Sequence, residues 1–229
     1  MIALLDYGAG NLTSVRKGLA AVGAEFFTPV APEDLAAATG IIVPGVGHFA
    51  ALRAIDAGWR AAILASVERR TPLFGICLGL QYLFEGSDEA PDVQGLGLLP
   101  GRITRLPPTL KVPHVGWNAL ARTGPSVLLD GVAEGAQVYF THSYAAPVTD
   151  ACVASTTHSA TFASAVERDQ IFGVQFHPEK SSDAGLHILR SFVRITKSPN
   201  PAITKSANSE ITKSPNHQIP SLPPCSPDA

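Results

Sequence analysis

The chain has 229 residues, 45% hydrophobic and 16% charged, which is the composition of an ordinary globular protein and excludes disorder throughout. Lys and Arg number 17 against 19 Asp and Glu, so the net charge is −2, and no basic run suggests binding to nucleic acid or to an anionic membrane. No apolar stretch approaches the roughly 18 residues of a membrane span, and the N-terminus lacks a basic start and a cleavage site. We therefore expect a cytoplasmic protein.

The first half of the chain alternates short apolar runs with helix-like segments. Residues 2–5 are typical of a buried strand, and a helix follows over 12–22, with apolar residues at helical spacing and a glycine after it. Two more pairs of this kind are predicted, with strands at 41–43 and 73–76 and helices at 59–69 and 78–84. This alternation predicts a mainly parallel sheet with helices on both faces.

The second half is richer in strands. Five strand-like runs occur with few helices between them, at 102–106, 138–143, 152–156, 161–167 and 171–176. One last helix is predicted over 183–193, with Leu186, Leu189 and Val193 on its inward face. The expected fold class is α/β, a three-layer, flavodoxin-like open mixed sheet that is mainly parallel, with antiparallel strands added by the second half.

The character of the sequence changes after residue 194. Ile-Thr-Lys-Ser-Pro-Asn begins at Ile195 and recurs, once with Ala in place of Pro, at a period of eight residues. One isoleucine per repeat cannot line a helix face or one side of a strand, so little burial is available to offset the ordering entropy. We expect one folded domain over 1–194 and a disordered tail, rich in Pro, Ser and Lys, over 195–229.

Cys77 has a position typical of a nucleophile. Three cysteines in a chain of this length do not make a disulfide framework, so free thiols are expected. Gly75 and Gly79 flank Cys77 where a predicted strand runs into a helix, which is the pattern of a nucleophile elbow. The helix N-terminus favours the thiolate, and the N–H of Leu78 points to where an oxyanion forms. Taken alone, the pattern also fits a buried structural cysteine.

His177 and Glu179 end the last predicted strand. Residues at i and i+2 of an extended chain project to the same face, so Glu179 is placed to orient His177. A cysteine nucleophile needs a base that takes its proton and later protonates the leaving group, and this base needs a fixed tautomer. Cys77, His177 and Glu179 are therefore predicted to form a catalytic triad. His177 alone also fits a strand-end histidine bonded to a backbone carbonyl.

The loop Pro44-Gly45-Val46-Gly47 follows the strand expected beside the one that ends at Cys77. Its two glycines allow the backbone to approach a ligand or to change the orientation of a peptide. The loop is predicted to donate a second oxyanion N–H, from Val46 or Gly47, besides that of Leu78. The simpler interpretation is an ordinary turn after a strand.

Three motifs together resemble the class I, triad-type glutamine amidotransferases: the segments 44–49, 77–81 and 177–180. Within that family, the segments 7–11, 111–118 and 139–144 resemble the glutaminase subunits of imidazole glycerol phosphate synthase. The resemblance runs from residue 2 to about 194, with the motifs in the expected order, and does not cover the tail.

The resemblance implies hydrolysis of glutamine to glutamate and ammonia. Cys77 attacks the amide, the N–H of Leu78 and a peptide of the Val46-Gly47 loop hold the oxyanion, and His177 protonates the departing ammonia. The family also implies the residues that hold glutamine, which are Gly45, Gln81, Glu89 and the backbone at His142, Ser143 and Tyr144. For Glu89 the simpler interpretation is a solvated surface carboxylate.

The resemblance also implies a partner. Ammonia must reach its acceptor without meeting bulk water, and in the resembling enzymes the acceptor is on a (β/α)₈-barrel cyclase. That heterodimer makes imidazole glycerol phosphate and aminoimidazole carboxamide ribotide in histidine biosynthesis, and its glutaminase depends on the nucleotide bound to the cyclase. Asn11, Trp117 and Lys180 are expected at the interface. The simpler roles are a helix cap for Asn11, core packing for Trp117 and a solvated charge for Lys180.

Parts of the sequence also fit other functions. The segment Gly8-Ala9-Gly10 imitates a dinucleotide fingerprint, but Thr13 takes the place of the third glycine and no acidic residue closes a second strand. Amidotransferase subunits serving anthranilate, aminodeoxychorismate or pyridoxal phosphate synthesis are nearer alternatives, and the segment 111–118 argues against them. A non-catalytic interaction subunit is disfavoured by the three triad residues. No metal-ligand spacing is present, and no cofactor is implied.

Overall fold

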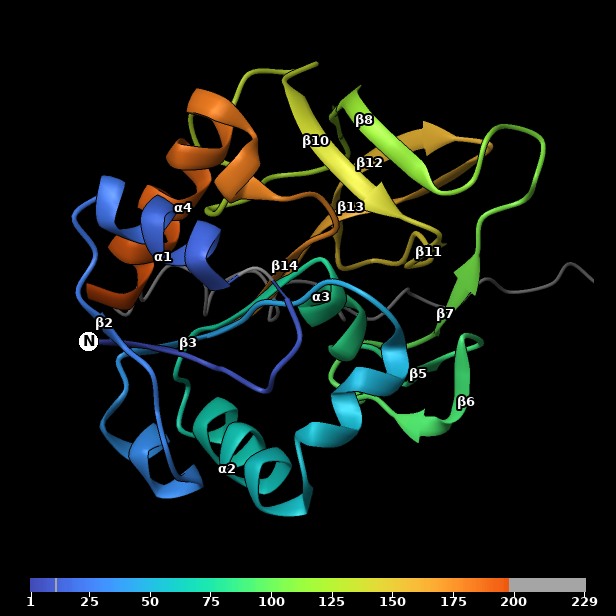
Figure 1. Ribbon diagram of the computed structural model, residues 1–229. Helices are drawn as coiled ribbons and strands as arrows, with labels where there is room; N and C mark the ends of the chain where they lie inside the picture. Colours follow the sequence, from blue (N-terminus) through green and yellow to red (C-terminus); the bar gives the residue numbers. More distant parts are fainter. Residues whose placement is uncertain (11, 198–229) are drawn as a thin grey trace, which may run out of the picture. The chain divides into compact units, whose positions relative to one another are not determined.

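An eight-stranded mixed sheet organises the computed structural model, which describes residues 1–10 and 12–197 (Figure 1). The strand order is β2-β1-β3-β4-β14-β13-β12-β9. In this order the strands are Phe26–Phe27, Ile2–Leu4, Gly40–Val43, Leu73–Ile76, Ile171–Val174, Ala160–Arg168, Cys152–His158 and Ala121–Arg122. Neighbours from β2 to β14 pair parallel and those from β14 to β9 antiparallel, which confirms the predicted mainly parallel sheet with antiparallel additions.

Helices cover both faces of this sheet. Helices α1 and α4 lie together on one side and α2 lies on the other, as Figure 1 shows. The α-helices of the described residues are α1 (Leu12–Ala21), α2 (Ala57–Glu68), α3 (Leu78–Tyr82) and α4 (Ser182–Lys197), and the 3₁₀-helices are η1 (Pro32–Ala37), η2 (Phe49–Ala54) and η3 (Pro178–Lys180). None of these helices is long and apolar enough to cross a membrane.

The parallel strands form the centre of the core. All residues of β1, β3, β4 and β14 are buried, as expected for strands covered on both faces. Helix α3 is shorter than the predicted 78–84 and ends at Tyr82. Its five residues are all buried, so its N-terminus and the ends of β3, β4 and β14 meet inside the protein.

Two small sheets extend the second half. Strand β8 (His114–Ala119) pairs with β10 (Gln137–His142), and a four-stranded sheet has the order β11-β7-β5-β6. Its strands are Tyr144–Ala145, Arg102–Arg105, Gly86–Ser87 and Ala90–Gln94. The predicted strands 102–106 and 138–143 therefore lie outside the central sheet, and β8, β5 and β6 were not predicted.

Helix α4 continues past the predicted domain boundary. It runs to Lys197, and Ile195 is buried, so a boundary after residue 194 falls inside the helix. Leu186 is only half-buried, contrary to the prediction, and Gly185 takes the inward position instead. The reason is close packing, because a Cβ on Gly185 would lie 1.9 Å from the carbonyl oxygen of Pro178. The rest of the predicted tail, 198–229, lies outside the described residues.

Candidate active site

Cys77 occupies a tight turn between β4 and α3. Its φ of 52° is in the left-handed region, which is unfavourable for a residue with a side chain. The flanking glycines are sterically required, since a Cβ on Gly75 would lie 2.4 Å from the Gly79 backbone, and a Cβ on Gly79 would lie 1.8 Å from the Val43 oxygen. The N–H of Cys77 donates to the Val174 oxygen at 2.8 Å, which fixes the turn against β14. The predicted strand-turn-helix context of Cys77 is present.

His177 and Glu179 enter the same region from the end of β14. Strand β14 is the direct neighbour of β4, with Val174 opposite Ile76. The His177 Nδ1 atom lies 2.8 Å from Glu179 Oε1, and the two side chains are only 2% and 3% exposed. The hydroxyl of Ser181 donates to the His177 carbonyl at 2.6 Å and fixes its backbone. Glu179 is bonded to Nδ1 of His177, so the buried Nε2, which has no hydrogen-bond partner among the described residues, is the ring nitrogen available for proton transfer.

The surroundings of His177 favour its protonated form. Burial by itself lowers the pKa of His177, because desolvation disfavours the imidazolium. Interactions with Cys77 and with Glu179 oppose burial and raise the pKa of His177 to about 10. The arrangement thus favours an imidazolium next to Cys77.

The loop after β3 is held in a defined conformation. The N–H of Leu78, predicted to bind an oxyanion, donates to the carbonyl oxygen of Gly45 at 3.3 Å. The hydroxyl of Tyr7 donates to the Pro44 carbonyl at 2.6 Å and lies where a Cβ of Gly45 would be. Gly47 has φ 107°, a value that favours glycine. The Leu78 N–H, one of the predicted oxyanion donors, is therefore bonded to the loop after β3 in this conformation.

A pocket of about 270 Å³ opens next to Cys77, a size suited to a small molecule. Nine residues predicted for the site line it: Val46, Gly47, Cys77, Leu78, Gln81, Glu89, His142, Ser143 and Tyr144. Pro113 and Thr141 complete the lining, whereas Gly45, His177 and Glu179 lie outside it. Glu89 is half-buried and its Oε2 accepts the N–H of Phe49 at 2.7 Å, so it is not simply a solvated carboxylate.

Two residues at the site were missed by sequence reasoning. Gln175 is fully buried, and its Nε2 donates to Cys77 Sγ at 3.5 Å. Its Oε1 accepts from Gln81 Nε2 at 3.2 Å, and Gln81 also donates to the Tyr144 carbonyl at 3.0 Å. Tyr7, the second, holds the loop after β3. The available signal was a polar residue within the apolar run of 171–176.

The predicted interface residues that the structure describes lie on its surface. Trp117 is 53% exposed, which excludes a core role, and Val115 beside it on β8 is 56% exposed. The ring of Tyr139, on β10, meets Trp117 edge to face at 6.0 Å, and Lys180 Nζ lies 5.8 Å from the Tyr139 ring centre. We call Val115, Trp117, Tyr139 and Lys180 the β8–β10 surface. Asn11 lies outside the described residues.

No group of three or more His, Cys, Asp or Glu side chains in the described part of the chain is placed to hold a metal ion. The polar groups around Cys77 are instead bonded to one another, through the contacts of Gln175 and Gln81 described above. The site thus brings a thiol, an imidazole and a carboxylate together beside a small pocket.

Comparison with known proteins assigns this arrangement to a family. The family model described as glutamine amidotransferase class-I matches residues 3–195. The imidazole glycerol phosphate synthase subunit HisH of Methanothermobacter thermautotrophicus is 46% identical over 86% of this chain and all of the relative. The protein with the same description from Gloeobacter violaceus is 47% identical over 88% of this chain and 92% of the relative.

Solved structures show the same fold at low sequence identity. A crystal structure of a glutamine amidotransferase superposes with a TM-score of 0.68 at 19% identity, covering 86% of this chain and 99% of the other. The structure of PurLQS from Thermotoga maritima gives 0.67 at 17% identity, covering 84% of this chain and 97% of the other. From the family match and the similarity to the HisH relatives, the chain belongs to the class-I glutamine amidotransferases and, within them, to the HisH subunits of imidazole glycerol phosphate synthase.

Proposed function

We propose that the chain hydrolyses glutamine to glutamate and ammonia with Cys77, His177 and Glu179 as its catalytic triad. The observation that supports this most directly is the buried His177–Glu179 pair, delivered by β14 next to the turn that holds Cys77. The pocket beside the thiol has the size of a small substrate, and its lining includes the polar side chains of Gln81 and Glu89. The HisH relatives support glutamine as the substrate.

The reaction follows from these groups. The Cys77 thiolate attacks the carboxamide carbon, and the electron pair of the carbonyl moves to oxygen to give a tetrahedral oxyanion. His177 gives its proton to the amide nitrogen, the C–N bond breaks, and ammonia leaves a thioester on Cys77. His177 then takes a proton from water, which attacks the thioester and releases glutamate. Throughout, Glu179 holds Nδ1 of His177 and thereby the tautomer and ring orientation.

The loop after β3 controls the oxyanion site. While the Gly45 carbonyl accepts the Leu78 N–H, that donor is occupied and a carbonyl dipole is directed toward it. Turning the Gly45–Val46 peptide over removes this oxygen and presents the Val46 N–H in its place. A single oxyanion donor is worth about a hundredfold or more in rate. The conformation in the structure is therefore a slow one, and activation requires the peptide to turn.

The ammonia is passed to a partner. We propose a heterodimer with the (β/α)₈-barrel cyclase of imidazole glycerol phosphate synthase in histidine biosynthesis, because the relatives are described as subunits of that enzyme. The β8–β10 surface is the proposed contact region, since it exposes Trp117 and Val115 next to Lys180. The anthranilate, aminodeoxychorismate and pyridoxal phosphate alternatives receive no support from these relatives.

The triad is tested by Cys77→Ala in complex with the cyclase from the same source. Glutamine-dependent synthesis falls to background, whereas synthesis driven by added ammonium salts remains, because only the glutaminase step is removed. Cys152→Ala is the matched control, since Cys152 is a second buried free thiol outside the pocket and its loss leaves the glutaminase unchanged. Glutaminase activity persisting in the Cys77→Ala protein would refute the triad.

The switch is tested by measuring glutamine hydrolysis of the isolated chain, then with the cyclase, then with the cyclase and its nucleotide. We expect a rate increase of about a hundredfold or more in the last state, the value of one oxyanion donor. If the isolated chain hydrolysed glutamine as fast as the full complex, the hydrogen bond of the Leu78 N–H would not regulate the rate.

A further inference from the structure

Two buried histidines at the pocket, one of them the lining residue His142, have side chains that take no part in the proposed reaction. His114 on β8 and His142 on β10 are only 4% and 6% exposed, and they face each other across the strand pair. The His114 Nδ1 and His142 Nε2 atoms lie 3.0 Å apart, and His142 Nδ1 lies 2.9 Å from the Tyr144 carbonyl oxygen. Their neighbour Asn118 brings its Nδ2 to 3.4 Å from His114 Nε2.

The chemistry of these atoms fixes the direction of every hydrogen bond. A carbonyl oxygen only accepts, so His142 carries its proton on Nδ1 and donates it to Tyr144. In the neutral ring, Nε2 of His142 is then an acceptor, and His114 must donate to it from Nδ1. Nε2 of His114 becomes an acceptor in turn, and the Asn118 amide nitrogen, which only donates, supplies its proton.

The surroundings keep both rings neutral. The His114 ring stacks between His158 and Phe140, with centres 4.1 and 4.8 Å away, and the edge of the His142 ring meets Phe162 at 4.8 Å. Burial among these rings lowers the pKa of His114 to about 4 and that of His142 to about 3. The single-proton assignment therefore holds across the neutral pH range.

The Tyr144 carbonyl joins this chain to the thiol. Besides His142 it accepts Gln81 Nε2 at 3.0 Å, so both lone pairs of the oxygen are used. The second N–H of Gln81 goes to Gln175, whose own amide nitrogen donates to Cys77 Sγ at 3.5 Å. On the histidine side, every group donates toward the Tyr144 oxygen. On the other side, Gln81 donates both to this oxygen and to Gln175, and Gln175 donates to Cys77, so one backbone oxygen of the pocket wall connects the two histidines with the thiol.

We propose that His114 and His142 are positioning residues that fix the Tyr144 carbonyl, and through it Gln81, in the geometry that binds glutamine. This inference rests on the proposed function and adds two side chains to it. Their contribution is to substrate binding rather than to bond breaking, because Tyr144 and Gln81 line the pocket. Loss of the donor at His114 therefore raises the KM for glutamine and changes kcat less.

The first test is the tautomeric state, measured by ¹⁵N NMR of the histidine rings of the full wild-type chain at pH 7. Both His114 and His142 are expected as Nδ1–H tautomers, with Nε2 unprotonated. This measurement needs neither a variant nor an activity. A His142 ring protonated on Nε2, or a cationic His114, would overturn the relay whatever the enzyme does.

The second test uses a pair of variants of similar size in the complex with the cyclase. His114→Asn keeps an amide donor where Nδ1 was, whereas His114→Leu removes it and leaves His142 Nε2 buried and unpaired. We expect the glutamine KM of His114→Leu to rise about tenfold, with kcat within about threefold, and His114→Asn to restore most of the loss. Equal KM values for the two variants would overturn the positioning role.

The experiments distinguish failure of the proposed function from failure of the positioning role of His114 and His142. A wild-type complex without any glutaminase activity would refute the proposed function and the role in glutamine binding together, while the wild-type NMR result still decides whether the relay exists. Normal activity with unchanged KM in His114→Leu would refute only the positioning role.

Discussion

At the residue scale, opposing influences set the protonation state of His177. The side chain is almost fully buried, which favours the neutral ring, yet it contacts two groups that are anionic in the reactive state. Their influence exceeds desolvation and raises the pKa of His177 to about 10. In the proposed mechanism, the proton that His177 gives to the leaving ammonia is therefore already on the ring before the reaction starts.

This balance predicts a titration that depends on Cys77. In the wild-type chain the His177 ring stays protonated well above pH 7, and in Cys77→Ala its pKa falls because one anionic neighbour is lost. NMR titration of the ring measures both, with Cys152→Ala as the unchanged control. Because the folded pKa lies above the unfolded value, the stabilisation from this proton is complete below pH 6.5 and is lost as the pH rises toward 10. A titration midpoint of the wild-type His177 ring at or below pH 6.5 would contradict the stabilisation of its protonated form by Cys77 and Glu179.

Local settings with a strong sequence signature could be predicted. The flanking glycines predicted the strand-turn-helix setting of Cys77, and the spacing of two residues predicted the contact between His177 and Glu179. Gln175, Tyr7 and His114 have no such signature, because their roles depend on which strands become neighbours. The pattern of polar and apolar residues along a buried strand does not show that Gln175 contacts the Cys77 sulfur, which is far away in the sequence. Tyr7 belongs to the predicted motif 7–11, but the sequence does not predict its hydrogen bond to Pro44, which depends on the crossover from β1 to β3.

At the scale of elements, the elbow depends on two strands and a helix packing without space for a methyl group. We predict that Gly79→Ala destabilises the protein by about 3 kcal/mol or more, because the new Cβ would lie 1.8 Å from a backbone oxygen of β3, which cannot move away. The matched control is Gly124→Ala, where no atom lies within 4 Å of the added carbon, with an effect within about 0.5 kcal/mol. Chemical denaturation measures both, and similar losses would show that packing at the elbow is not the cause.

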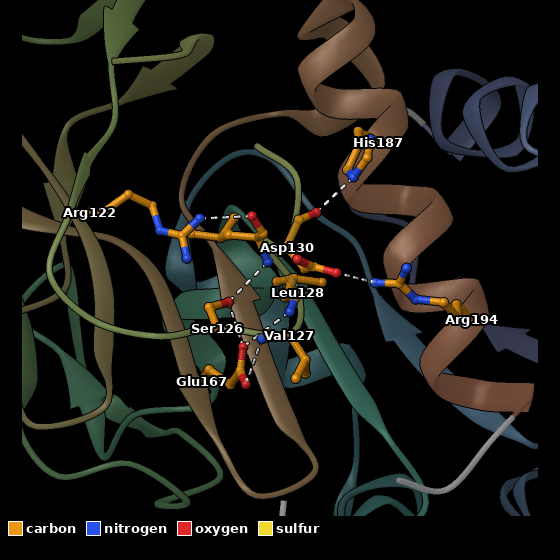
Figure 2. Close-up of polar contacts among 9 residues, drawn as sticks. Arg122, Ser126, Val127, Leu128, Asp130, Glu167, His187 and Arg194 are labelled. Atoms are coloured by element: carbon orange, nitrogen blue, oxygen red, sulfur yellow. Dashed lines mark hydrogen bonds and ion pairs between the residues drawn. The ribbon is translucent and has the colours of Figure 1, made fainter. Parts of the chain in front are cut away.

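A second element-scale feature fastens the chain that leads into β10, and Figure 2 shows its contacts. Glu167 on β13 accepts the Ser126 hydroxyl at 2.6 Å and the N–H groups of Val127 and Leu128, each at 3.2 Å. From helix α4, His187 Nε2 donates to the Asp130 carbonyl at 2.7 Å, and Arg194 pairs with the Asp130 carboxylate at 3.2 Å (Figure 2). The turn 126–130 thus joins the antiparallel side of the sheet to α4.

The contacts of this turn differ in how much they contribute to the free energy of unfolding. Glu167→Ala leaves two backbone N–H groups of a half-buried turn without an acceptor, so we predict a loss of about 2–3 kcal/mol. Arg194→Ala breaks an ion pair whose side chains are 61% and 68% exposed, and costs less than about 1 kcal/mol. Denaturant unfolding of both variants gives the comparison. A larger effect for Arg194→Ala would reverse the ranking.

Continuous apolar runs and helices with apolar residues at helical spacing were predictable, whereas short or isolated elements were not. The structure confirms the parallel strands β1, β3, β4 and β14 and the helix α2, whereas the two-residue parallel strand β2 was not predicted. In strand β8 only His114 is buried, and the strand contains Gly116 and the exposed Trp117, so its sequence resembles a loop. Its pairing with β10 away from the central sheet depends on tertiary packing, which no local pattern encodes.

At the scale of the whole molecule, we propose that the folded domain ends with α4 and that residues 198–229 are dispensable for activity. A chain that ends at residue 197 is expected to keep the stability and glutaminase activity of the full chain. A chain that ends at 194 loses Ile195, which is 6% exposed, and the contact of Thr196 with Gly40, at a cost of about 1–3 kcal/mol. Thermal unfolding distinguishes the two truncations, and equal stability of both would place the boundary back at 194.

The place of β14 in the sheet has a consequence for how the chain is made. This strand is the last of the sheet to leave the ribosome, yet it pairs with β4 on one side and with β13 on the other. The central sheet is therefore incomplete in its middle until synthesis is nearly finished, and its contacts have high sequence separation. A nascent chain that ends before β14 contains Cys77 but lacks His177 and Glu179. Under the proposed triad, such a fragment does not hydrolyse glutamine, and hydrolysis starts only after β14 has joined the sheet.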